Sequence, residues 1–194
     1  LDVFRSEDSI KLDRKTLVIL RWIAIIGQLV TINIVYFVLK YQFPFFYCCS
    51  IIFIGILSNL YLQLKVKGNL VNNLSSTTYL LYDLTQLSGL LFLTGGITNP
   101  FVILLTIPAI VSSTFLNLRS TINLSFITVL FLIVLTIYHY PLPSPGNLHF
   151  HVPKFYLYAI PISVITGLIF LTYFGARFGI ETRKRSEALS KLEL

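Results

Sequence analysis

The chain alternates between long apolar runs and short polar or irregular segments. Six apolar runs lie at about 16–39, 43–64, 78–94, 99–116, 120–140 and 154–176. A helix needs roughly 20 apolar residues to cross the hydrocarbon core of a bilayer, and each run meets or approaches that length. The pattern therefore predicts an all-α, polytopic membrane protein with six transmembrane helices.

Composition agrees with this class. Of the 194 residues, 55% are hydrophobic and 12% are charged, whereas a soluble domain usually carries about 25% charged residues. The first apolar run is too long, and too poor in small residues at a cleavage position, for a removed signal peptide. A soluble globular domain is excluded.

The basic residues that give the net charge of +7 gather at alternate ends of the apolar runs. One set of ends carries Arg5, Lys11, Arg14, Lys15, Arg21, Lys65, Lys67, Arg119, Arg177, Arg183, Lys184, Arg185 and Lys191. The other set carries only Lys40 and Lys154. Because Lys and Arg accumulate on cytoplasmic flanks, both termini are predicted to be cytoplasmic, and the connections at 40–43, 95–101 and 141–153 to lie outside. No basic face with interleaved aromatic residues is present, so we expect no direct contact with nucleic acid.

Three regions follow from this layout. Residues 1–15 form a cytoplasmic tail, residues 16–176 a six-span membrane domain, and residues 177–194 the start of a cytoplasmic helix for signalling or dimerisation. From Glu181 onward this segment contains helix formers without a Gly or Pro stop, and a frayed juxtamembrane helix is the alternative. The chain has no methionine and ends inside this segment, so we expect it to be truncated at both ends.

The most irregular segment is Gly95–Phe101, with the sequence GGITNPF. Non-helical backbone at membrane depth is tolerated only where protein covers it or where it lines a cavity. Asn99 is a favoured N-cap and Pro100 suits the first helical position. We expect Asn99 to accept a hydrogen bond from the next turn while its amide donates outward. The free N–H groups and positive dipole end of the fourth span would point at any ligand in the gap.

A flat, apolar molecule with carbonyl oxygens would suit such a site. Gly95 and Gly96 end the third span and permit positive φ and close approach, and Phe101 supplies an aromatic face. The alternative is a tight outer turn between two antiparallel helices, because Gly-Gly and Asn-Pro are common in turns. Spacing alone favours this turn over a ligand site.

Several segments resemble one family. Residues 81–87 (LYDLTQL) and 91–101 (LFLTGGITNPF) are similar to the third-to-fourth span region of RegB/PrrB-type redox sensor histidine kinases. Residues 20–24 (LRWIA), with Gly27 and Gln28, resemble the first span of that family. In the family, GGxxNPF is the ubiquinone-binding motif of the membrane domain. The resemblance implies a sensor in the bacterial inner membrane that reports the redox state of the quinone pool.

This resemblance assigns quinone binding to five residues: Gly95, Gly96, Asn99, Pro100 and Phe101. Ile97 and Thr98 occupy variable positions of the motif. Ubiquinone or a related quinone is the implied ligand, and no metal is expected. The phosphoacceptor histidine, the ATP-binding domain and the redox-active cysteine of the family lie beyond the sixth span, so this chain is not expected to be a kinase itself. The implied partners are membrane lipid, a second copy of the chain and, through a kinase domain, a response regulator.

Asp83 is the only acidic residue within the predicted spans, with Gln86 on the same helical face. An intramembrane carboxylate is a functional hypothesis by default. Asp83 precedes Gly95 by about 18 Å of helix, which makes direct quinone contact implausible. We expect a structural hydrogen bond or ion pair, with Arg21 or Arg119, and a conformational relay is the alternative.

Three other features leave alternatives open. His139, His149 and His151 favour a solvated outer loop over a metal site, and His139 alternatively lines the quinone entrance. Gly175 and Gly179 form a GxxxG spacing that suits either a dimer contact or packing within one bundle. A six-span transporter or channel is the rival function, and it would require ionisable residues from several spans to meet near the midplane.

Overall fold

The computed structural model describes residues 13–65, 72–145 and 152–192, and it is helical throughout these ranges apart from short connections. The elements in chain order are α1 (Arg14–Asn33), a π-helical turn (Ile34–Val38), α2 (Phe45–Lys65), α3 (Asn73–Leu93), η3 (Gly96–Thr98), η4 (Pro100–Thr106), α4 (Ile107–Phe115), α5 (Leu118–Ile137) and α6 (Lys154–Leu192). Here η3 and η4 are 3₁₀ helices. No β-strand forms in the described ranges, and the predicted all-α class is confirmed.

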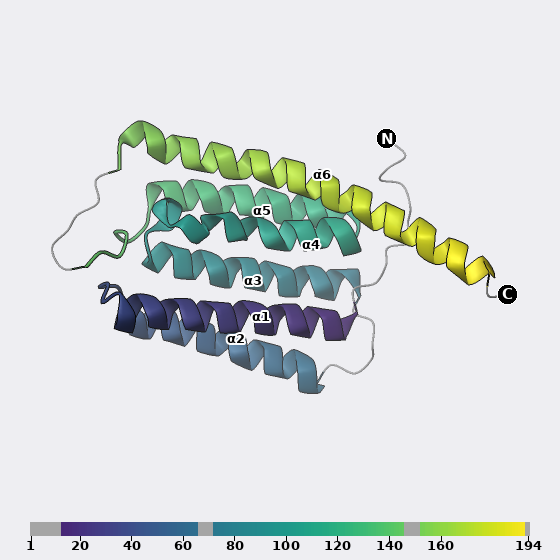
Figure 1. The fold of residues 1–194 in the computed structure, drawn as a ribbon, viewed down its shortest axis with the longest axis horizontal. Helices are drawn as coiled ribbons and strands as arrows, with labels where there is room; N and C mark the ends of the chain where they lie inside the picture. Colours follow the sequence, from purple (N-terminus) through teal and green to yellow (C-terminus); the bar gives the residue numbers. More distant parts are fainter. Residues whose placement is uncertain (1–12, 66–71, 146–151, 193–194) are drawn as a thin grey trace.

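The helices lie lengthwise beside one another in a bundle with α3 near its middle (Figure 1). α3 packs against α2, α4 and α5, while α1 packs mainly on α2, and α6 on α4 and α5. Two apolar clusters fill the interior. The larger draws residues from all of the long helices and from η3 and η4, with Leu84, Leu105 and Leu132 among its fully buried members. The smaller joins α1 and α2 to Leu90 of α3, around Ile25 and Ile52.

Four helical segments are long and apolar enough to cross a membrane: Arg14–Val38, Phe45–Leu64, Leu118–Ile137 and Lys154–Thr182. The chain is therefore a helical membrane protein with four clear candidate spans among its described residues. α3 has 21 residues, but Asp83 and Gln86 lower its hydropathy. Both side chains find partners inside the bundle, as shown below, so the polarity of α3 reflects its central position.

The fourth predicted span is split between η4 and α4, which together form the short apolar segment Pro100–Phe115. Pro108 explains where the 3₁₀ helix changes to an α-helix. Proline has no N–H, so the carbonyl of Leu104 cannot accept an α-type bond from position 108. Instead this carbonyl accepts a 3₁₀-type bond from the N–H of Ile107. Pro108 thus stands at the second position of α4, whereas Pro161 lies inside α6.

The three connections that were predicted to lie outside meet at one end of the bundle. The N–H of Gln42 donates to the carbonyl of Ser144 over 3.4 Å, and Tyr41 pairs with Pro145 in an isolated β-bridge. The N–H of Tyr140 donates to the carbonyl of Phe92 over 2.8 Å. We call residues 138–145 the strap, because this segment joins the α1–α2 connection to the end of α3.

The GxxxG pair lies inside the bundle and packs on α4. A Cβ atom at Gly175 would overlap the Ser113 hydroxyl, and a Cβ at Gly179 would stand 2.5 Å from the Thr114 carbonyl oxygen. The two glycines therefore let α6 approach the end of α4 closely. Of the two interpretations left open by the sequence, packing within one bundle is the one observed.

Gly179→Ala is expected to lower the free energy of unfolding by about 1–3 kcal/mol, because the new methyl meets immovable backbone. The matched control is Gly167→Ala on the same helix, where a Cβ meets nothing within 4 Å. That control should be neutral or stabilising by up to about 1 kcal/mol, the helix propensity gain. Thermal unfolding in lipid nanodiscs, followed by circular dichroism, compares the two. Equal stability of both variants would contradict the close α4–α6 contact.

Candidate functional site

The GGITNPF segment forms a compact turn between α3 and η4. Gly95 and Gly96 have φ angles of 111° and 53°, in the left-handed region that residues with a side chain rarely adopt. The carbonyl of Gly95 accepts bonds from the N–H of Thr98 at 3.0 Å and from its hydroxyl at 2.6 Å. The N–H of Asn99 donates to Gly96 over 3.2 Å. The backbone of the turn is thus satisfied largely from within.

Asn99 is the N-cap of η4, as the sequence predicts. Its Oδ1 accepts from the N–H of Phe101 at 2.9 Å. Its Nδ2 donates to the carbonyl and the hydroxyl of Thr94, each at 2.9 Å. The expected outward donation is therefore wrong for this structure, because the amide donates back to the end of α3. The first N–H groups are not free either, since Val102 also donates, to the carbonyl of Asn99.

The strap covers the two glycines. A Cβ at Gly95 would stand 2.6 Å from a methyl carbon of Leu142. A Cβ at Gly96 would overlap the side chain of His139 and stand 2.8 Å from the carbonyl oxygen of Leu135. The space left by the missing side chains at Gly95 and Gly96 is thus occupied by other residues of the protein. The space that we expected to admit a ligand ring is filled by the α5–α6 connection.

The exposed part of the GGITNPF segment is its last two residues. Pro100 is exposed, and Phe101 retains 44% of its surface. Further along η4 and α4, Ile103 and Ile107 are exposed at 45% and 48%. An apolar track therefore runs from the turn along the outside of the bundle, facing the region where lipid would lie.

The histidines are only partly placed. His139 lies against Gly96, whereas His149 and His151 lie outside the described residues. Within the described ranges, no group of three or more His, Cys, Asp or Glu side chains is arranged to hold a metal ion.

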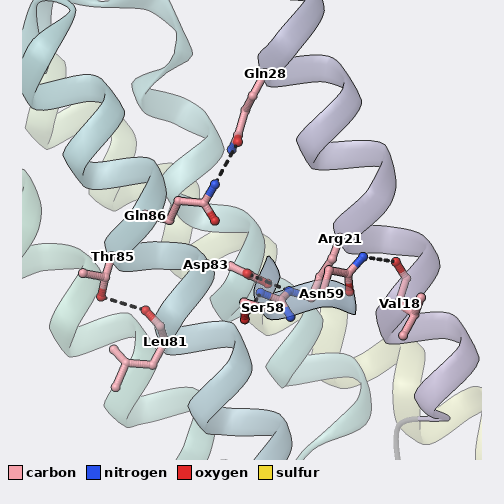
Figure 2. A network of polar contacts seen from close by, with 9 residues as sticks. All are labelled: Val18, Arg21, Gln28, Ser58, Asn59, Leu81, Asp83, Thr85 and Gln86. Carbon is pink, nitrogen blue, oxygen red and sulfur yellow. Dashed lines mark hydrogen bonds and ion pairs between the residues drawn. The ribbon is translucent and has the colours of Figure 1, made fainter. Parts of the chain in front are cut away.

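A second polar region lies between α1, α2 and α3 and contains Asp83 (Figure 2). Asp83 Oδ1 accepts from Arg21 Nε at 2.8 Å, and Arg21 Nη2 donates to the hydroxyl of Ser58 at 3.0 Å. The guanidinium carbon lies 5.4 Å from the ring centroids of both Tyr79 and Tyr82. Arg21 is only 3% exposed. The predicted ion pair is therefore confirmed with Arg21, while the other candidate partner, Arg119, is exposed.

Gln86 extends this polar region by one turn along α3. Its Nε2 donates to Gln28 Oε1 on α1 at 3.2 Å, and its amide packs on Gly55 of α2, where a Cβ would stand 2.7 Å from Gln86 Oε1. On α2, Asn59 donates to the carbonyl of Val18 at 3.2 Å. The sequence did not single out the α2 contributors, because an isolated Gly, Ser or Asn in an apolar run carries no local signal of its partner.

Asp83→Ala is expected to destabilise the protein by about 3–5 kcal/mol, because it leaves the buried Arg21 charge without its partner. The double variant Arg21→Leu, Asp83→Leu should recover much of this loss, since an apolar pair replaces the ion pair. Arg119→Ala is the control and should change stability by less than about 0.5 kcal/mol. Urea or thermal unfolding in nanodiscs measures all three. A double variant no more stable than Asp83→Ala would contradict the proposed charge pairing.

Comparison with known proteins supports the family named by the resemblance. No protein-family model and no solved structure matches the chain. The chain is 33% identical to the sensor histidine kinase RegB of Cereibacter sphaeroides over 176 residues, which cover 90% of this chain and 38% of that protein. It thus spans well under half the length of this relative. With its helical membrane architecture, the chain is a RegB-type sensor membrane domain.

Proposed function

We propose that the chain is the membrane sensor of a two-component histidine kinase and that it binds ubiquinone or a related quinone at the GGITNPF turn. The observation that carries this proposal is the exposed ring of Phe101 at the end of an otherwise closed turn, in a chain similar to the sensor kinase RegB. An aromatic ring that faces lipid beside a fixed backbone offers a stacking surface for a flat molecule arriving from the membrane.

In this proposal some residues contact the quinone and others hold the turn in position. Phe101 packs on the quinone ring, and Pro100 fixes the start of η4 beside it. Ile103 and Ile107 continue the apolar surface along which an isoprenoid tail lies. Gly95, Gly96 and Asn99 hold the turn in shape through their backbone conformations and through the bonds to Thr94 and Phe101. In this assignment the glycines and the amide are positioning residues, and the ring contact belongs to Phe101.

The proposed topology has six spans with both termini in the cytoplasm of a bacterium, in its inner membrane. The 21 residues of α3 extend about 31 Å at 1.5 Å per residue, close to the hydrocarbon thickness of about 30 Å. The seven residues of η4 and nine of α4 extend about 27 Å, because a 3₁₀ helix rises about 2.0 Å per residue. The 3₁₀ form thus lets a short segment nearly span the membrane.

The proposed output is a movement of α6. Oxidised quinone accepts hydrogen bonds at its ring oxygens, whereas the reduced form also donates them. A ligand shifts a conformational equilibrium only by its different affinities for the two states. η4 continues directly into α4, and the end of α4 packs on Gly175 and Gly179 of α6. α6 runs unbroken to Leu192, toward a kinase that would act on a response regulator, and a second copy of the chain completes the sensor.

The site is tested by equilibrium titration of the chain in nanodiscs with ubiquinone-1, a short-chain ubiquinone. Phe101→Ala should weaken binding by about tenfold or more, because it removes an aromatic contact together with its buried area. The control is Phe126→Ala, since Phe126 is also an exposed phenylalanine, at 62%, but lies on α5. Equal affinity of the wild type, Phe101→Ala and the combined Asn99→Ala, Phe101→Ala variant would disprove the site.

The output is tested by the distance between spin labels at Tyr61 and Phe178, which are exposed at 61% and 67% on α2 and α6. The free Cys48 and Cys49 are first replaced by alanine. Electron–electron double resonance should show a distance distribution that shifts when oxidised ubiquinone-1 is replaced by its reduced form. The shift should vanish in Phe101→Ala. An unchanged distribution in a wild type that binds quinone would contradict movement of α6.

A further inference from the structure

His139 carries a buried polar atom that has no partner at the candidate site. Four buried side-chain N or O atoms in the described residues lack a hydrogen-bond partner: Arg21 Nη1, Asn59 Oδ1, Ser76 Oγ and His139 Nδ1. The first two belong to the α1–α2–α3 polar region, and Ser76 lies in the first turn of α3. His139 alone among them lies beside the GGITNPF turn, with its side chain directly over Gly96.

A buried nitrogen without a hydrogen-bond partner calls for a physical explanation. Leaving a buried donor or acceptor without a partner is costly, and such groups in native proteins commonly await a water, an ion or a ligand. At the same time the amide of the turn is already engaged, because both acceptors of Asn99 Nδ2 belong to Thr94. A quinone oxygen that reaches the turn therefore needs a polar partner from outside the motif.

We propose that His139 is this partner and that its Nδ1 hydrogen-bonds a ring oxygen of the quinone. The inference rests on the proposed function, since it names a contact within the same site. A neutral imidazole suits both redox forms. One tautomer carries hydrogen on Nδ1 and donates to the carbonyl of the oxidised ring, while the other leaves Nδ1 free to accept from a hydroxyl of the reduced ring. The histidine thereby keeps a hydrogen bond to the ring in both redox forms.

A turn of the imidazole would bring this nitrogen within reach of a ligand. His139 as a residue is only partly buried, although its Nδ1 is covered. A turn of the ring about its Cβ–Cγ bond exchanges the positions of Nδ1 and Cδ2, and this torsion is soft in histidine. The strap that carries His139 is joined to α3 through the N–H of Tyr140 and through the contact of its ring with Phe92, at 5.6 Å between centroids.

Two substitutions at position 139 separate a ligand contact from a structural role. His139→Leu removes the nitrogen at similar volume, and His139→Asn keeps a polar atom near the place of Nδ1. Binding of ubiquinone-1 to the chain in nanodiscs is measured by titration calorimetry, and the melting temperature is measured without quinone. Tyr140→Phe is the matched control, because it keeps the neighbouring ring and removes only a hydroxyl.

His139→Leu should weaken binding about tenfold, the effect of one lost hydrogen bond, while the melting temperature without quinone stays the same or rises. His139→Asn should retain most of the affinity, and Tyr140→Phe all of it. Wild-type affinity in His139→Leu would overturn the inference and leave the proposed function standing. Parallel losses of affinity and melting temperature in both His139 variants would show a structural role and also overturn it. No binding by the wild type would overturn the proposed function itself.

Discussion

Hydrocarbon supplies no hydrogen-bond partner, so a polar group inside a membrane bundle must find its partner within the protein. The pairing of Arg21 with Asp83 meets this requirement for the groups that are hardest to bury, because both carry a charge on membrane helices. Ser58 and two tyrosine rings surround the guanidinium. Removing charges from water is costly unless such partners are present. The pair therefore fixes which faces of α1, α2 and α3 meet, and with them the centre of the bundle.

The same requirement explains the outer turn. A chain that reverses direction near the membrane surface exposes the last carbonyls of one helix and the first N–H groups of the next. Here Thr94, Thr98 and Asn99 supply side-chain partners, and the positive φ angles of the glycines close the turn tightly enough for the strap to cover it. Most of the motif is thus explained by the fold. In the proposed function, the groups that remain for recognition of a quinone are the face of Phe101 and the nitrogen of His139.

Much of this arrangement could be predicted from local sequence. Apolar length indicated the helices, and Asn99 before Pro100 marked the start of the fourth span at the observed residue. The sequence predicts a structural hydrogen bond or an ion pair for Asp83, with Arg21 or Arg119, and the pair with Arg21 forms. Other features depend on residues far apart in the chain. The neighbours of Gly95 and Gly96 are Leu142 and His139, which come much later in the chain, and no periodicity shows them. The 3₁₀ form of η4 was also not predicted from sequence. It depends on the hydrogen bond that the N–H of Ile107 donates to the Leu104 carbonyl, which Pro108 cannot use.

The packing also separates two roles that polar and small residues play in this bundle. The polar region around Asp83 joins α1, α2 and α3, and in the described residues its hydrogen bonds include none to α6. The end of α4, in contrast, packs on α6 at Gly175 and Gly179, where the nearest α4 atoms are hydroxyls of Ser113 and Thr114 and backbone atoms of Ile110 and Thr114. Close contact between backbones leaves little room to absorb a displacement. In the proposed function, a change at the turn would therefore reach α6 through α4, while the ion pair joins α1 and α3 on the other side of the bundle.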